Sequence, residues 1–154
     1  MSRETFPVPY LERDVAIYLA GLIDGEGTFI IQRNARGQGY TYNSAFKLVL
    51  TDEATIEWVS SKLQRPYSFV NGNESKNQRA AYCIRISDHR GLIDFIEQIL
   101  PFMIVKREAA ETIIAFCKSR IAQQQSKYHS GYSDFDISRW KKIKKLNKVG
   151  IQSE

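Results

Sequence analysis

The sequence predicts an α+β domain in which the elements run helix, two strands, helix, two strands, helix, with further helices at the C-terminal end. Two observations carry this prediction. The run Val15–Ile23 consists only of apolar and small residues, as in a buried helix, whereas residues 40–50 alternate as a strand does. With 154 residues, 43% of them hydrophobic and 25% charged, we expect one domain spanning residues 1–154.

Composition excludes several classes of protein. No apolar run approaches eighteen residues and the N-terminus lacks the layout of a signal peptide, so we expect an intracellular protein with no membrane partner. The expected compartment is a prokaryotic (archaeal or bacterial) cytoplasm, or an organelle matrix or stroma. Cys83 and Cys117 are far apart, which argues against a zinc site or a disulfide framework. His89 and His129 are isolated, so histidine-based catalytic motifs have no support.

The first helix carries two glycines and ends in two acids. Gly21 and Gly25 stand four residues apart on one face, where missing side chains let another backbone come close. Each glycine costs the helix about 1 kcal/mol, so the pair predicts a close contact. Asp24 and Glu26 lie at the negative end of the helix dipole, which is unfavourable unless a cation is bound. If two copies pack through this face, their acids meet and favour a divalent metal.

The next segment is predicted to form a hairpin. We expect a strand at 28–33, a flexible loop at 34–39 and a strand at 40–50 whose Phe46, Leu48 and Leu50 face the core. The other face of this sheet is polar and carries Lys, Asn and Gln, which can read base edges in the major groove of DNA. A ten-residue strand spans roughly 33 Å, close to the ~34 Å of one DNA turn, so a two-fold pair of such sheets could follow about twenty base pairs. The alternative is an ordinary half-exposed sheet with a solvated outer face. Our candidates for DNA contacts from the strands are Gln32, Asn34, Arg36, Tyr40, Asn43, Lys47, Ser68, Arg79 and Arg85.

Caps and prolines mark the remaining elements. Thr51-Asp52-Glu53 is typical of a helix start, and that helix ends before Pro66. Strands at 67–70 and 80–86 follow, then a helix opened by Asp88 that stops before Pro101. A further helix is expected at 106–120, a polar connection at 123–131, and a last helix capped by residues 133–136. This places the core at about 12–120 and a basic helical extension at about 133–150.

The charge distribution favours a polyanionic partner. The net charge is +5 and the pI is near 9.2, and basic residues cluster between Arg139 and Lys148. Such a cluster suits phosphate contacts, which make binding salt-dependent; the alternative is a solvated helix face. We expect the last helix to lie outside the core along a DNA backbone, with Arg139, Lys141 and Lys142 as candidate contacts.

The segment Leu19-Ala20-Gly21-Leu22-Ile23-Asp24-Gly25-Glu26-Gly27 closely resembles the signature of the LAGLIDADG homing endonucleases. It differs in reading Gly-Glu-Gly where the family most often reads Gly-Asp-Gly or Ala-Asp-Gly. The resemblance implies an αββαββα core with a saddle-shaped antiparallel sheet, reaching from about Val15 to Lys118. It also implies a site-specific, magnesium-dependent double-strand DNase. On this pattern Glu26 is the matching metal ligand, helped by the carbonyl of Gly25; Mn²⁺ or Ca²⁺ could also occupy the site, and we expect no other small-molecule cofactor.

Only one copy of this signature is present, so the chain has no internal repeat that would supply both halves of such an enzyme. A homodimer with closed two-fold symmetry follows, and its double-stranded DNA target should be nearly palindromic. The expected interface residues are Ala20, Gly21, Leu22, Asp24 and Gly25.

Two further catalytic candidates come from the same resemblance. The segment 101–106 resembles the one that precedes the final core helix in single-motif members, where a lysine lies beside the scissile phosphate; Lys106 matches it. There it could stabilise the charge that develops on the phosphate and help to activate the attacking water. The family often places a polar residue just after the second strand, and Asp52 occupies that position. The implied reaction cuts one phosphodiester on each strand and leaves short 3′ overhangs, for intron or intein mobility.

Two other functions stay open at this point. An RNA-binding maturase that assists intron splicing would use the same fold without needing Glu26. A non-cleaving DNA-binding regulator would retain Glu26 and Lys106 only incidentally. Cleavage of plasmid DNA by the unaltered chain and by Glu26→Gln separates these possibilities from a nuclease.

Overall fold

The computed structural model describes residues 7–72, 75, 79–124 and 131–152. The observed element order confirms the predicted α+β class. The elements are α1 (Arg13–Glu26), β1 (Gly27–Arg36), β2 (Gly39–Leu50), α2 (Glu53–Leu63), β3 (Tyr67–Val70), β4 (Ala81–Ile86), α3 (His89–Ile99), a 3₁₀ turn (Leu100–Phe102), α4 (Arg107–Gln124) and α5 (Asp134–Gln152). No helix within the described ranges is long and apolar enough to cross a lipid bilayer.

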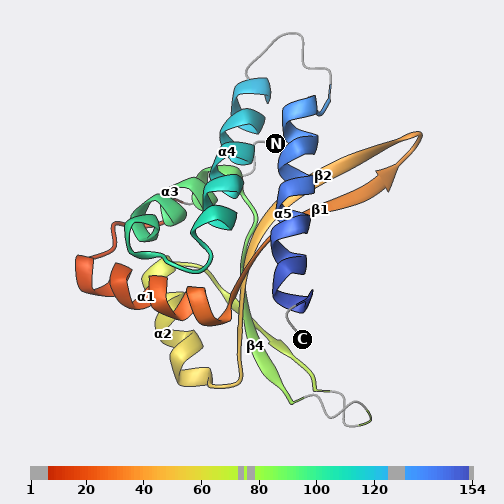
Figure 1. Ribbon diagram of the computed structural model, residues 1–154. Coiled ribbons are helices and arrows are strands. Elements are labelled where there is room, and N and C mark those ends of the chain that lie inside the picture. The colour runs from red at the N-terminus through yellow and green to blue at the C-terminus, as the bar shows by residue number, and fades with distance from the viewer. Residues whose placement is uncertain (1–6, 73–74, 76–78, 125–130, 153–154) are drawn as a thin grey trace.

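The four strands form one antiparallel sheet in the order β1-β2-β4-β3. Strand β1 pairs with β2 along its whole length, from Gly27 opposite Leu48 to Arg36 opposite Gly39. Strand β4 pairs with only the second half of β2, from Phe46 to Leu50. The far part of the β1–β2 hairpin is therefore a two-stranded ribbon, and Figure 1 shows it projecting from the body of the molecule.

The prediction of a flexible loop at 34–39 is wrong. Both strands continue through this segment, and the turn consists of Gly37 and Gln38 only. Gly37 has φ of 61°, a conformation that glycine adopts without a steric penalty. Residues 34–39 are all exposed to water, so the backbone pairing continues through them without an alternating hydrophobic pattern.

One face of the sheet is buried under helices. Phe46 and Leu48 of β2 are fully buried, as the alternation predicted, and Phe29 and Ile31 of β1 join them. In Figure 1 helices α1 to α4 lie together on one side of the sheet. The helices contribute to the same core through buried residues that include Leu19, Ile23, Ile56, Val59, Phe95, Ile96, Ile113 and Phe116.

The predicted helix caps are confirmed. The carboxylate of Asp52 accepts a hydrogen bond from Thr55 N at 3.0 Å and begins α2. Asp88 accepts one from Gly91 N at 2.9 Å and begins α3. Asp88 also forms an ion pair with Arg65 at 2.5 Å, which joins the end of α2 to the start of α3.

Helix α5 packs on the body of the protein, contrary to the expectation that it lies outside the core. Ile143 is only 2% exposed and Asp136 is fully buried. Asn147 donates to the carbonyl oxygen of Phe29 at 3.0 Å, which ties α5 to the outer edge of β1. Residues 136, 140, 143 and 147 recur at helical spacing, so they form one packing face beneath the lysines that dominate the composition.

Candidate active site and the open face of the sheet

The C-terminal end of α1 passes directly into β1, and Gly27 makes this possible. Its N–H donates to the carbonyl oxygen of Ile23 and closes the last helical turn. A Cβ at this position would lie 2.7 Å from Cγ2 of Ile23 and 3.1 Å from Cε2 of Phe46. Only glycine fits here, and the exposed Glu26 is therefore held at the junction of helix and sheet.

Asp24 fastens a distant segment to this junction. Its carboxylate accepts hydrogen bonds from Ile104 N at 2.8 Å and from Lys106 N at 3.0 Å. Burial raises the pKa of the Asp24 carboxyl, but the backbone N–H groups outweigh this effect and the pKa lies below its ordinary value. We predicted Asp24 as an interface residue, whereas its side chain binds its own chain. About eighty residues separate the partners, so no sequence spacing signals this contact.

Lys106, the predicted catalytic lysine, lies beside the end of α1. Its ammonium group donates to the carbonyl oxygens of Ile23, at 3.3 Å, and of Gly27. An ammonium group has three N–H donors, so one remains that can be directed at a ligand. Burial lowers the pKa of Lys106, while the charges of Asp24 and Glu26 act in the opposite direction. A cavity of about 250 Å³ adjoins the ammonium group and is lined by Gly27, Thr28, Phe29, Lys106, Ala109 and Asn147.

The donor set at the end of α1 fits a hard divalent cation only in part. Glu26 is exposed at a helix end, where main-chain carbonyl groups lack helical partners. Such oxygen donors suit Mg²⁺, which typically binds through one or two carboxylates and keeps several waters. Within the described part of one protomer, no three acidic, histidine or cysteine residues come together as a metal site. At the end of α1 the Glu26 carboxylate is exposed, whereas the Asp24 carboxylate accepts backbone hydrogen bonds, so a fuller site would need a second copy or a phosphate.

Asp52, predicted as a catalytic candidate as well as a cap, lies at the start of α2. Its carboxylate accepts hydrogen bonds from both the N–H and the hydroxyl group of Thr55. The hydroxyl and N–H of Thr55 lower the pKa of the Asp52 carboxyl. The side chain is thus occupied at the start of α2, beyond the end of the sheet, and we leave it out of the proposed catalytic set.

Within the described ranges, no helix or strand covers the face of the sheet opposite the helices, and we call this face the open face. Direct cross-strand pairing places Gln32 beside Asn43, and places Lys47 between Thr28 and Arg85. Like charges directly opposite one another, as Lys47 and Arg85 are, destabilise a sheet unless an anion binds them. The open face consists of Thr28, Ile30, Gln32, Asn34, Arg36, Thr41, Asn43, Ala45, Lys47, Val49, Ser68, Val70, Ala81, Cys83 and Arg85, and none of these strand residues is acidic.

Seven of the nine residues predicted from the strands to contact DNA come together on the open face. Arg79 is exposed just before β4 begins. Tyr40 lies on the opposite side, because it pairs with Ala35 and shares the face of Tyr42. Its ring contacts the guanidinium group of Arg33, 4.3 Å from the ring centroid. Side chains alternate along β2, so Tyr40 lies on the same side as Phe46 and Leu48, and the predicted alternation already required this placement.

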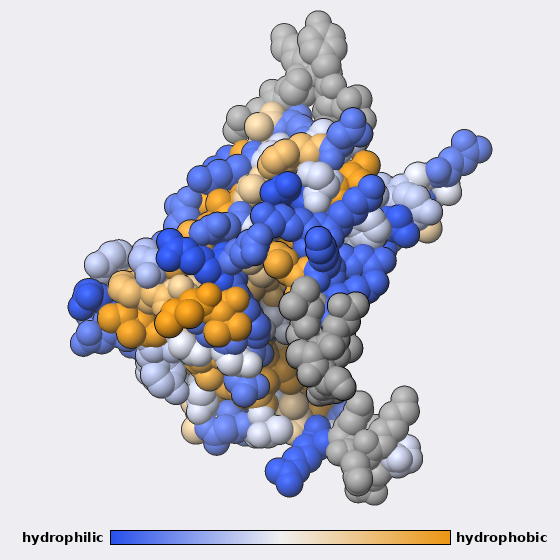
Figure 2. Space-filling view, in the orientation of Figure 1, coloured by the Kyte–Doolittle hydropathy of each residue, from blue (hydrophilic) through white to orange (hydrophobic). Residues whose placement is uncertain are grey.

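An exposed apolar surface surrounds the two helix glycines. Gly21 and Gly25 are exposed, and a Cβ added to either meets nothing within 4 Å. Figure 2 shows hydrophobic residues gathered over α1. Near its end, Ile104 is 84% exposed and Val105 is 75% exposed.

Two other predicted interface residues are less exposed than Gly21 and Gly25. Ala20 is fully buried inside the protomer, so its side chain cannot contact a partner. Leu22 is partly buried. Among the predicted residues, the exposed positions Gly21 and Gly25 therefore follow one stripe of the helix, which is set by its 3.6-residue period.

The basic residues predicted on α5 are only partly available. Lys141 is exposed, whereas Lys142 forms an ion pair with Glu108 of α4 at 3.3 Å. The guanidinium group of Arg139 lies over the ring of Phe135, 5.1 Å from its centroid.

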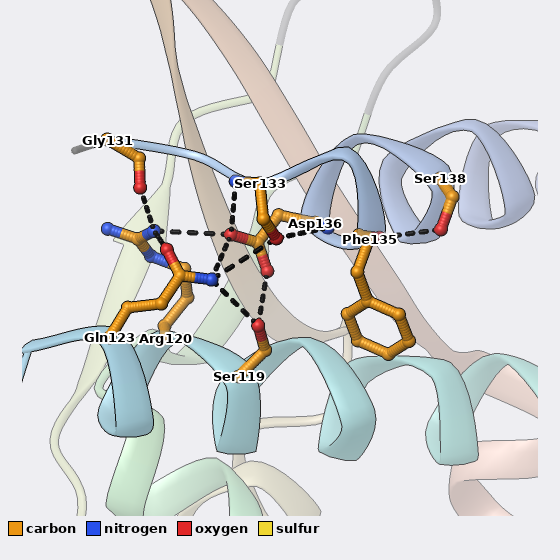
Figure 3. A network of polar contacts seen from close by, with 8 residues as sticks. All are labelled: Ser119, Arg120, Gln123, Gly131, Ser133, Phe135, Asp136 and Ser138. Atoms are coloured by element: carbon orange, nitrogen blue, oxygen red, sulfur yellow. Dashed lines mark hydrogen bonds and ion pairs between the residues drawn. The ribbon is translucent and has the colours of Figure 1, made fainter. Parts of the chain in front are cut away.

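A buried network that sequence reasoning missed anchors α5 to α4 (Figure 3). Ser133 and Asp136 form the predicted cap reciprocally: Asp136 N donates to Oγ of Ser133 at 3.2 Å, and Ser133 N donates to the Asp136 carboxylate at 3.1 Å. The same carboxylate pairs with Arg120 at 3.2 Å and accepts from Gln123 at 2.8 Å and Ser119 at 2.7 Å. The cap was visible in the sequence, but its partners on α4 were not.

These features define an α+β protein with a carboxylate and a lysine at the end of a glycine-faced helix, next to a basic open sheet. A family model described as LAGLIDADG endonuclease matches residues 19–117. The chain therefore belongs to the LAGLIDADG endonuclease family. No curated protein matches the sequence.

Solved structures share the fold at low sequence identity. The homing endonuclease I-CvuI, solved with its target in the presence of 2 mM Ca, has a TM-score of 0.60 at 14% identity, covering 88% of this chain and 96% of that one. The archaeal intron-encoded homing endonuclease I-Vdi141I, complexed with DNA, has a TM-score of 0.60 at 16% identity, and the match covers 88% of this chain and 99% of that one. The LAGLIDADG homing endonuclease I-GzeII, in complex with its DNA target, has a TM-score of 0.62 at 13% identity, and the match covers 85% of this chain but 43% of that one. These likenesses confirm the predicted fold.

Proposed function

We propose that this chain is a homodimeric, single-motif homing endonuclease that cuts both strands of a long, near-palindromic DNA target in the service of intron or intein mobility. One observation carries the proposal. The open face is basic and free of acids, and its strand β1 begins directly after Glu26, beside Lys106. A surface that attracts a polyanion therefore leads to a site suited to phosphodiester chemistry.

The open face has the length and side chains for reading base edges in a major groove. Strand β1 has ten residues and spans roughly 33 Å, about one turn of DNA. Gln32 and Asn43 carry amide groups that suit adenine, and Arg85 can donate to guanine through two N–H groups. Lys47 lies next to Thr28 at the inner end of the face, nearest to Glu26. Lys141 and its neighbours on α5 are assigned to phosphates, which position the protein without reading sequence.

The proposed chemistry uses Glu26 and Lys106. Glu26 and the carbonyl group of Gly25 would hold a divalent cation, preferably Mg²⁺, which supplies Lewis-acid stabilisation of phosphate oxygens and acidifies bound water. Lys106 is held by the carbonyl oxygens of Ile23 and Gly27, and directs its remaining N–H toward the phosphate as negative charge develops. Asp24 acts as a positioning residue, because it fixes the backbone of Lys106.

The single signature and the exposed surface of α1 support the proposed dimer. Two copies related by a two-fold axis would bury Gly21, Gly25 and the exposed Ile104 and Val105, and bring their two Glu26 carboxylates together. The chain covers nearly the whole of I-CvuI and I-Vdi141I but less than half of I-GzeII, which supports a protomer that is half of a functional unit. Cuts on opposite strands flanking the axis would then leave staggered ends.

Cleavage selection tests this function. A plasmid library carrying two-fold symmetric inserts of about twenty base pairs is incubated with the protein and Mg²⁺, and linear products are sequenced. We expect one related set of inserts to be cut on both strands, with short 3′ overhangs. Glu26→Gln and Lys106→Met should bind the selected insert but cut at least about a hundredfold more slowly.

Asp52→Asn serves as the control, because it perturbs a helix cap outside the proposed catalytic set and should retain the cleavage rate. Tight binding with no cleavage by the unaltered chain would instead identify a DNA-binding regulator. Cleavage that is unaffected by Glu26→Gln would refute the assignment of the site.

A further inference from the structure

The end of the open face farthest from Glu26, which we assign to the outer base pairs of the target, lacks the support that the rest of the sheet has. From the pair Gln32–Asn43 to the pair Arg36–Gly39, no third strand of the described part of the chain pairs with β1 or β2, because β4 begins its pairing at Phe46. An isolated two-stranded ribbon is marginally stable in water and twists more strongly than a larger sheet. A ribbon that reads bases at fixed positions therefore needs a support on its back.

Helix α5 supplies this support through a stack of side chains. The guanidinium carbon of Arg33, on the back of β1, lies 4.3 Å from the ring centroid of Tyr40 and 4.4 Å from that of Trp140 on α5. Arg33 is thus in contact with two aromatic rings, one from the ribbon and one from the helix. Lys144 of α5 adds a charge 5.2 Å from the centroid of Trp140.

A second set of contacts continues from the ribbon into the body of the protein. Tyr42, only 6% exposed, lies edge-on to Trp140 with ring centroids 5.6 Å apart and to Tyr132 with centroids 5.1 Å apart. The guanidinium group of Arg120 lies 4.0 Å from the centroid of Tyr132 and pairs with the buried Asp136.

Helix α5 is fixed to the rest of the protein at two points. At its start the network of Figure 3 joins Asp136 to Ser119, Arg120 and Gln123 of α4. Farther along, Asn147 binds the carbonyl group of Phe29 on the edge of β1. Between these points lies Trp140, whose position relative to the ribbon is therefore fixed by the rest of the fold.

We propose that Trp140 and Arg33 are positioning residues that determine specificity: they hold the back of the β1–β2 ribbon so that Gln32, Asn34 and Asn43 on its open face keep the geometry that reads the outer base pairs. This inference rests on the proposed function, because it assumes that the open face reads DNA. It gives α5 a role beyond phosphate binding, because Trp140 would influence which bases are accepted without contacting a base itself.

The first test needs no DNA. Hydrogen–deuterium exchange of the full chain is compared for the unaltered protein, Trp140→Ala, Trp140→Phe and Arg33→Lys. In Trp140→Ala we expect the amides of residues 33–43 to exchange at least about fivefold faster, with β4 unchanged. Trp140→Phe keeps a ring in the stack and should restore most of the protection. Arg33→Lys keeps the charge but loses the planar group, and should fall between the two.

The second test uses the duplex selected by cleavage and variants of it with single base changes. Trp140→Ala should reduce discrimination at the outer positions at least about tenfold, and leave both the inner positions and the cleavage rate at saturating protein unchanged. Lys141→Ala is the matched control on α5: it should weaken binding to all sequences alike and lower the salt dependence.

Two outcomes overturn the inference: unchanged exchange of residues 33–43 in Trp140→Ala, or a uniform loss of affinity like that of Lys141→Ala. If the unaltered chain selects no duplex, the proposed function fails, while the exchange measurements still decide whether α5 supports the ribbon.

Discussion

Replacing Gly21 by alanine should have opposite effects on the protomer and on the dimer. In the protomer, Gly21 is exposed in the middle of α1, and an added Cβ meets nothing within 4 Å. Alanine is better than glycine in a helix interior by about 1 kcal/mol, so the free energy of unfolding of the separated chain should rise by about that amount.

In the dimer the same methyl group enters the interface. If two α1 helices touch through their glycine faces, each protomer adds one methyl group to a close contact. Overpacking costs about 1–3 kcal/mol per site, hence about 2–6 kcal/mol for the symmetric pair. The dissociation constant should therefore rise by a factor between about 30 and 10⁴.

Two measurements check this pair of effects. Sedimentation equilibrium gives the dissociation constant, and denaturant unfolding at concentrations well below it gives the stability of the separated chain. Gly39→Ala is the matched control, because Gly39 lies in the hairpin, also has nothing within 4 Å of an added Cβ, and should leave association unchanged. An unchanged dissociation constant for Gly21→Ala, or an unaltered chain that stays monomeric on its DNA, would refute the proposed interface.

Three further outcomes are expected. Burial raises the pKa of Asp136, but hydrogen bonds from Ser119, Ser133, Gln123 and Arg120 outweigh this effect and lower the pKa. The carboxylate therefore stabilises the fold above about pH 4, and this stabilisation is lost as the pH falls further. Asp136→Asn should lower the free energy of unfolding by about 3–5 kcal/mol at pH 7 and weaken its dependence on acid pH, which chemical denaturation at several pH values would measure. Burial raises the pKa of the Cys117 thiol to about 12, so in the native protein a thiol reagent should label only the partly exposed Cys83. Both thiols should be labelled only after unfolding, and rapid labelling of both in the native protein would contradict the burial of Cys117. Gly27→Ala should destabilise the chain by about 1–3 kcal/mol through its contacts with Ile23 and Phe46, and slow cleavage by displacing Lys106; full activity and stability would contradict the tight junction.

Local signals in the sequence determined the order of the elements. The alternation at Phe46 and Leu48, the caps at Asp52 and Asp88 and the capping pair at Ser133 and Asp136 depend on neighbours a few residues away, so each could be recognised without the fold. The signature ending at Gly27 likewise indicated the family. The length of the β1–β2 hairpin could not be recognised, because pairing outside the core leaves no hydrophobic pattern.

The tertiary structure alone decided which of the candidate side chains lie together. Asp24 was expected at the interface but binds the backbone of Lys106, and Ala20 was expected there but is buried, because helix geometry separates neighbouring residues onto different faces. The stack of Arg33 on Trp140 joins residues more than a hundred positions apart. Contacts of this kind depend on how the whole chain packs, and no short stretch of sequence carries them.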